Sequence, residues 1–181
     1  MAQLSNTNSY VDPMEVVEYN PSWATMFASE RDRITSAIGE HIISVEHIGS
    51  TSIPGLAAKP IIDMHIVVKD FDQLAQCVDG MTGIGYIYKG LFGIEGRQYF
   101  KRPLFHAHMV QHGNDAYMRH TLFLKYLREH ESTLKEYAEL KKGLAIKWAG
   151  NAKFHQGYCD DKTEFIMGVL EQAGWDPTRR P

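Results

Sequence analysis

The spacing of apolar residues changes at Asn114, and this change constrains the fold more than any other feature of the sequence. Upstream, β-branched segments separated by Gly and Pro predict strands at residues 41–48, 61–68, 86–88, 97–101 and 104–111. Helices are predicted after Asn20 and after Asp70, because each can cap the apolar helical pattern that follows it. Downstream, the spacing is helical to the end, and Asp161 with Glu164 resembles a capping box for the last helix. The prediction is an α+β protein with a mixed sheet, flanking helices and a helical C-terminal third.

The chain has 181 residues, a length that fits one domain. We expect that domain to span residues 14–175, with residues 1–13 and 176–181 as flexible tails. The net charge is −3 and no long run has one sign, so nucleic acid and membrane surfaces are not expected partners. Cys77 and Cys159 form no CxxC pair, and no leader or membrane-spanning stretch is visible. These features predict a cytoplasmic protein with reduced thiols, either a monomer or a homodimer.

A loop rich in Gly, Ser and Thr follows the first predicted strand. Its candidate phosphate-binding residues are Gly49, Ser50, Thr51, Ser52 and Lys59. Backbone N–H groups and hydroxyls at the end of a strand can converge on phosphate oxygens, and Lys59 would add a positive charge. On spacing alone, an equally good interpretation is that the hydroxyls satisfy the loop's own backbone.

Asp63 interrupts an otherwise apolar predicted strand, and His65 lies on the same face two residues later. A buried carboxylate is costly unless it meets a cation or hydrogen-bond donors, so Asp63 needs a partner. One hypothesis gives it a catalytic or metal-binding role. The alternative is a structural ion pair with Lys59 or Arg97, or a bond from a nearby backbone N–H.

His106 and His108 alternate on the last predicted strand, so both imidazoles point to one face. If that strand neighbours the strand of Asp63, these two histidines could converge with Asp63 and His65. One carboxylate with three imidazoles suits zinc or a transition metal better than magnesium. The alternative, equally weighted, is one histidine satisfied in the core and one in solvent.

Two further sets of cations have different predicted roles. Arg97 follows a glycine-rich turn, where a guanidinium could clamp a phosphate or form only a surface salt bridge. Lys141, Lys142 and Lys147 are predicted to lie on the solvated face of a helix.

Several of these motifs together resemble the GrpB family (glutamate-rich protein B-like proteins), which is placed in the nucleotidyltransferase superfamily. They are the segment of residues 19–23 (YNPSW), the long block of residues 46–63, Gly96-Arg97 and His106-Ala107-His108. The resemblance implies a nucleotidyltransferase fold, in which Gly-Ser holds a nucleotide triphosphate and acidic residues hold divalent metal. The sequence departs from that pattern, because Asp63-Met64-His65 stands where polymerase-like members carry two aspartates.

The resulting functional hypothesis is a nucleotidyltransferase-like protein whose partner is a nucleotide or another small phosphorylated ligand. Asp63 would be catalytic, and a divalent metal (Mg, Mn or Zn) would be held by Asp63, His65, His106 and His108. Two alternatives stay open: a binding module without catalysis, and a metal-dependent hydrolase that uses Asp63 with His106 and His108.

Overall fold

The computed structural model describes residues 11–176, so most of both predicted tails lies outside the described residues. Its centre is one sheet of β1 (Ser44–Ile48), β2 (Ile62–Val68), β3 (Ile87–Tyr88), β4 (Arg97–Arg102) and β5 (Phe105–Gln111). The strand order is β1-β2-β5-β4-β3. β2 and β5 are parallel, and every other neighbouring pair is antiparallel. The predicted mixed sheet is confirmed, and the strands of Asp63 and His106 are neighbours, which is the condition for these residues to converge.

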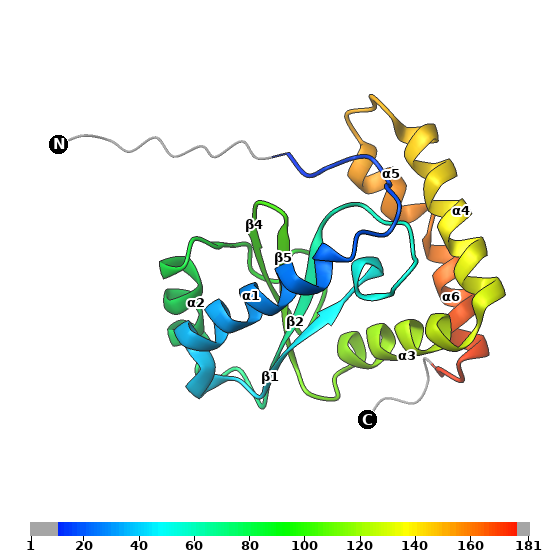
Figure 1. Ribbon diagram of the computed structural model, residues 1–181. Coiled ribbons are helices and arrows are strands. Elements are labelled where there is room, and N and C mark those ends of the chain that lie inside the picture. The colour runs from blue at the N-terminus through cyan, green and yellow to red at the C-terminus, as the bar shows by residue number, and fades with distance from the viewer. Residues whose placement is uncertain (1–10, 177–181) are drawn as a thin grey trace.

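One face of the sheet forms the main apolar core. Period-two alternation puts Ile62, Met64 and Ile66 of β2 on this face, together with Ala107 and Met109 of β5. They pack beneath α1 (Ser22–Ile38) and α2 (Leu74–Gly83), which lie on the same side of the sheet in Figure 1. Full burial of each large aliphatic side chain contributes about 1.5–3 kcal/mol, so this face fixes the register of β2 against β5.

The helical third lies on the other side of the molecule (Figure 1). It comprises α3 (Asp115–Glu129), α4 (Glu131–Trp148), α5 (Phe154–Asp160) and α6 (Thr163–Gln172). A second core of Leu56, Phe123, Leu127 and Leu170 joins these helices to the loop after β1. The predicted α+β arrangement is therefore confirmed. Among residues 11–176, none of the helices is long and apolar enough to cross a bilayer.

Two predicted helix caps are wrong. Asp161 precedes α6 but makes no capping bond, because its carboxylate accepts hydrogen bonds from Lys147 and Trp148 on α4. Asp70 accepts from the backbone N–H of Asp72 in a turn, and α2 begins only at Leu74. In both cases the local pattern was present but another donor was better placed.

Candidate functional site

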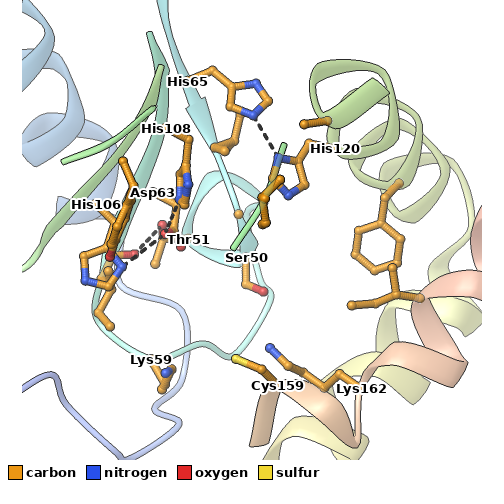
Figure 2. A pocket seen from close by; sticks show the side chains of 18 of the residues that line it. Ser50, Thr51, Lys59, Asp63, His65, His106, His108, His120, Cys159 and Lys162 are labelled. Atoms are coloured by element: carbon orange, nitrogen blue, oxygen red, sulfur yellow. Dashed lines mark hydrogen bonds and ion pairs between the residues drawn. The ribbon is translucent and has the colours of Figure 1, made fainter. Parts of the chain in front are cut away.

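A cavity of about 920 Å³ lies between the second face of the sheet and the helical third. This volume is in the range of small-molecule sites. Figure 2 shows Asp63, His106 and His108 together on one side of it, and Lys59 and Lys162 at another end. Of the predicted site residues, all except Ser52 line the cavity: Gly49, Ser50, Thr51, Lys59, Asp63, His65, Arg97, His106 and His108.

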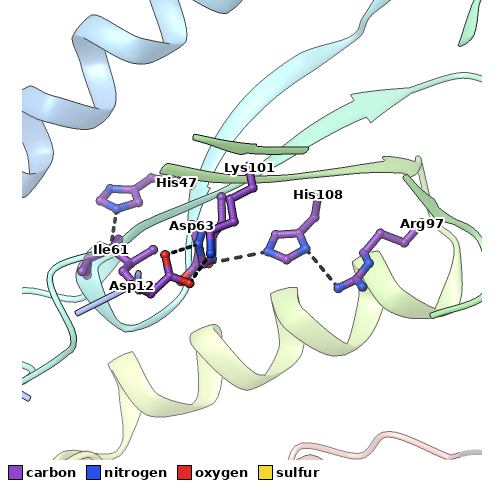
Figure 3. A network of polar contacts seen from close by, with 9 residues as sticks. Asp12, His47, Ile61, Asp63, Arg97, Lys101 and His108 are labelled. Atoms are coloured by element: carbon purple, nitrogen blue, oxygen red, sulfur yellow. Dashed lines mark hydrogen bonds and ion pairs between the residues drawn. The ribbon is translucent and has the colours of Figure 1, made fainter. Parts of the chain in front are cut away.

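Asp63 keeps 32% of its side chain exposed in this cavity. Its Oδ1 lies 3.6 Å from Nδ1 of His106 and 3.5 Å from Nε2 of His108, and Figure 3 shows the second contact. Burial alone would raise the pKa of Asp63, but the hydrogen bonds from both imidazoles hold that pKa well below its usual range. Among the described residues Asp63 contacts these two histidines and neither Lys59 nor Arg97, so the alternative of a structural ion pair with either cation is wrong. Burial lowers the pKa of His108, so its contact with Asp63 at neutral pH is that of an uncharged ring.

Asp12 reaches the same wall from the N-terminal segment. Its Oδ1 is 3.2 Å from Nε2 of His106, and Nζ of Lys101 donates to its Oδ2 at 2.7 Å. Asp12 is only 7% exposed, so it does not behave as part of the tail predicted for residues 1–13. Burial alone would lower the pKa of His106, but the bonds to Asp12 and Asp63 raise it to about 9. At neutral pH, His106 is therefore an imidazolium that bridges two carboxylates.

His65 makes a different contact. It is fully buried, and its Nε2 lies 2.8 Å from Nδ1 of His120 on α3. Burial and the neighbouring imidazoles lower the pKa of His65 to about 2 and that of His120 to about 4, so both rings are neutral at pH 7. In the described part of the chain, no group of three or more His, Cys, Asp or Glu side chains is arranged to hold a metal ion. Metal binding by Asp63 and the three histidines of the sequence analysis thus has no support from this geometry and stays a prediction.

The loop after β1 divides its hydroxyls between two roles. The Thr51 hydroxyl donates to the backbone oxygen of Ile61 at 3.0 Å, and the Ser52 hydroxyl donates to that of Gly49 at 2.7 Å. These two side chains satisfy the loop's own backbone, as the self-capping interpretation expects. Ser50 lines the cavity and is the loop hydroxyl best placed for a ligand.

Three lysines meet at one end of the cavity. The Nζ atoms of Lys59 and Lys162 lie 4.9 and 4.4 Å from the ring centre of Tyr158. Lys141 is 2% exposed and donates to the backbone oxygen of Ala57, so its predicted place on a solvated face is wrong. Burial lowers the pKa of all three, that of Lys141 to about 7. Within residues 11–176, no ion pair joins any of them to a carboxylate.

Arg97 begins β4 and is 7% exposed, which contradicts the predicted surface salt bridge. Its Nη2 donates to the backbone oxygens of Leu91 and Phe92, at 3.2 and 2.9 Å. Its Nη1 lies 3.3 Å from Nδ1 of His108, as Figure 3 shows. The guanidinium therefore links the turn before β4 to the histidine beside Asp63.

Several cavity residues were missed from the sequence. Two carried a usable signal: Lys141 shares a helical stripe with buried Tyr137 and Leu144, and His120 shares one with buried Ala116. A polar residue on an apolar stripe is buried when the stripe packs. Asp12 carried no such local signal.

We expect Asp12→Asn to lower the free energy of unfolding by about 1–3 kcal/mol at pH 6, because His106 and Lys101 lose a charged partner. The raised pKa of His106 contributes stability that is complete below its unfolded pKa of 6.5 and is lost as pH rises through about 9. The difference between wild type and variant should therefore shrink between pH 6 and pH 9.5. Urea unfolding at both pH values measures it, with exposed Asp32→Asn as control, and an equal loss at both would contradict the bridge.

Comparison with known proteins identifies the family. The GrpB protein family model matches residues 13–172. UPF0157 protein YqkA of Bacillus subtilis is 43% identical over 164 residues, which are 88% of this chain and 47% of YqkA, so this chain spans about half the length of that relative. The crystal structure of conserved protein GrpB from Enterococcus faecalis aligns with a TM-score of 0.80 and 35% identity, covering 88% of this chain and 96% of that one.

A more distant likeness concerns Cid1, whose structure in complex with its short product ApU aligns with a TM-score of 0.49. The identity is 14%, over 81% of this chain and 46% of that one, which is too distant to bear on activity or ligand. The match over residues 13–172 and the close agreement with the GrpB structure point the same way. The chain belongs to the GrpB family.

Proposed function

We propose that the cavity binds a nucleotide or another small phosphorylated ligand, with the phosphates at the end formed by Ser50, Lys59 and Lys162. The observation that carries this proposal is the group of lysines Lys59, Lys141 and Lys162 around one cavity, without an ion pair to a carboxylate among the described residues. Burying unpaired cations is costly, and such groups gather mainly where a ligand supplies the opposite charge. A phosphate offers several acceptor oxygens and would satisfy them together.

The position of Asp63 favours nucleotidyl transfer as a second candidate. A Cβ atom built on Gly49 would lie 2.7 Å from Oδ2 of Asp63, so a phosphate on this loop would lie close to that carboxylate. In such a transfer, an acceptor oxygen bonds the α-phosphorus, pyrophosphate leaves, and the acceptor proton passes to a base. The low pKa of Asp63 makes it a poor base, so its role would be to hold positive charge.

The metal hypothesis would place a divalent ion on Asp63, His65, His106 and His108, but their contacts do not favour it. His65 is instead bonded to His120, and His106 is held between two carboxylates, which favours the protonated ring that cannot bind metal. A pair of Mg²⁺ ions prefers oxygen donors, and these residues do not fit one. We therefore place the phosphate contacts on the lysines and the loop.

Titration calorimetry with ATP, UTP and tripolyphosphate tests the proposed binding. Wild type should bind, and Lys59→Met and Lys162→Met should each weaken affinity about tenfold, because each removes one charge from the phosphate end. Lys135→Met is the matched control, since Lys135 is exposed on α4 and pairs with Glu131. Absence of binding by wild type, or equal loss in the control, would contradict the proposal.

A further inference from the structure

We propose that the exposed ring of Phe92, backed by the buried ring of Tyr99, forms a stacking surface for an aromatic base, so that the ligand of this cavity is a nucleotide rather than a sugar phosphate or inorganic phosphate. This inference rests on the proposed phosphate binding and identifies the group to which the phosphate is joined. It comes from the turn between β3 and β4, which borders the cavity on the sheet side.

Phe92 is unusually placed for a large apolar side chain. It is 66% exposed, yet it lines the cavity. Its backbone has a φ of +45°, a conformation that costs a non-glycine residue free energy. Such strain persists only where the surrounding structure enforces it, and it concentrates at ligand sites.

Arg97 provides that enforcement. Its Nη2 bonds the carbonyl groups of both Leu91 and Phe92, and its guanidinium carbon lies 5.1 Å from the ring centre of Tyr99. No carboxylate pairs with this buried guanidinium among residues 11–176, so the carbonyl groups of the turn, the Tyr99 ring and Nδ1 of His108 hold it. The Phe92 ring is therefore presented by a fixed turn, which reduces the entropy lost when a ligand binds.

The aromatic faces continue from this turn toward Asp63. The rings of Phe92 and Tyr99 have centres 5.3 Å apart and an angle of 31° between their planes. Tyr99 in turn stacks on His108, with centres 5.2 Å apart and an angle of 26°. His108 contacts Asp63 at 3.5 Å. Tyr99 is only 7% exposed because it lies between these two rings, so it supports the Phe92 ring and Phe92 alone is open to a base.

Two parts of the cavity lining then define the ligand. The lysines require negative charge, and Phe92, which is 66% exposed, offers a flat apolar ring. A phosphate joined to a planar base meets both, whereas inorganic phosphate or a sugar phosphate leaves the Phe92 ring uncovered. Base stacking on aromatic side chains tolerates any base, because every base has a π face.

The experiment compares ATP and UTP with tripolyphosphate, by calorimetry, in variants of this turn. Phe92→Ala should weaken both nucleotides about tenfold and leave tripolyphosphate affinity unchanged. Phe92→Leu, which keeps apolar volume without a flat ring, should behave like Phe92→Ala, and Phe92→Trp should retain affinity. Leu91→Ala is the matched control, because Leu91 is 49% exposed on the same turn but does not line the cavity.

Unchanged nucleotide affinity in Phe92→Ala would overturn the platform, and so would full affinity in Phe92→Leu. Equal binding of nucleotides and tripolyphosphate by wild type would also overturn it while leaving the phosphate site standing. Failure of wild type to bind any of the three would instead remove the proposed function itself.

Discussion

Gly49→Ala is expected to lower the free energy of unfolding by about 2–4 kcal/mol and to abolish phosphate binding. Gly49 has φ +72° and ψ −178°, a region that is essentially restricted to glycine and costs other residues about 1–3 kcal/mol. An added Cβ would also lie 2.7 Å from Oδ2 and 2.9 Å from Cβ of Asp63, so that side chain would have to move. Moving Asp63 would break its contacts with His106 and His108.

Gly55→Ala separates the two causes. Gly55 lies in the same loop with φ +79°, but an added Cβ would meet no atom within 4 Å. The Gly55→Ala variant should therefore lose only the conformational part of the free energy of unfolding, about 1–2 kcal/mol, and keep its ligand affinity. Urea unfolding and calorimetry on both variants measure the difference. Equal losses in the two would mean that the contact between Gly49 and Asp63 does not shape the site.

The fold was predictable because its signals are local. Alternation in residues 61–68 and 104–111 placed Asp63 with His65, and His106 with His108, each pair on one face. The parallel pairing of β2 with β5 brought the pairs together. Alternation along the strands cannot predict which helix residues pack over them. His120 of α3 bonds His65, so Asp63 contacts only the other two histidines.

The rest of the site depends on contacts distant in sequence. Asp12 and His106 are 94 residues apart, and nothing near Asp12 indicates a buried partner. For Asp161 a local signal was present but misleading. Its sequence pattern fits a capping box, but its carboxylate accepts hydrogen bonds from Lys147 and Trp148 of α4 instead. Local patterns therefore predicted the elements, whereas competition between tertiary partners decided which polar groups serve the cavity.

The lowered pKa of Lys141 should make the free energy of unfolding depend on pH. Burial, helped by the charges of Lys162 and Lys142, lowers the pKa of Lys141 from 10.5 to about 7. Between these values the unfolded chain holds a proton that the folded protein does not, so the free energy of unfolding rises with pH. One such group contributes a slope of at most about 1.4 kcal/mol per pH unit.

Lys141→Met should remove that slope, because methionine keeps much of the side-chain volume and carries no proton. The measurement is urea unfolding of both proteins at pH 7, 8, 9 and 10. The opposing pH dependence of His106 is common to both and cancels in their difference. Lys135→Met is the control, since Lys135 is exposed on the same helix and pairs with Glu131.

Tripolyphosphate gives the same experiment a second readout. An anion bound beside Lys141 stabilises its charged form and raises its pKa toward the unfolded value. Saturating tripolyphosphate should therefore reduce the difference in slope between wild type and Lys141→Met, because the pKa shifts of the other groups are common to both proteins. Parallel curves for the two proteins without ligand would show that Lys141 keeps its proton when the protein folds, and that its charge is already balanced inside the fold.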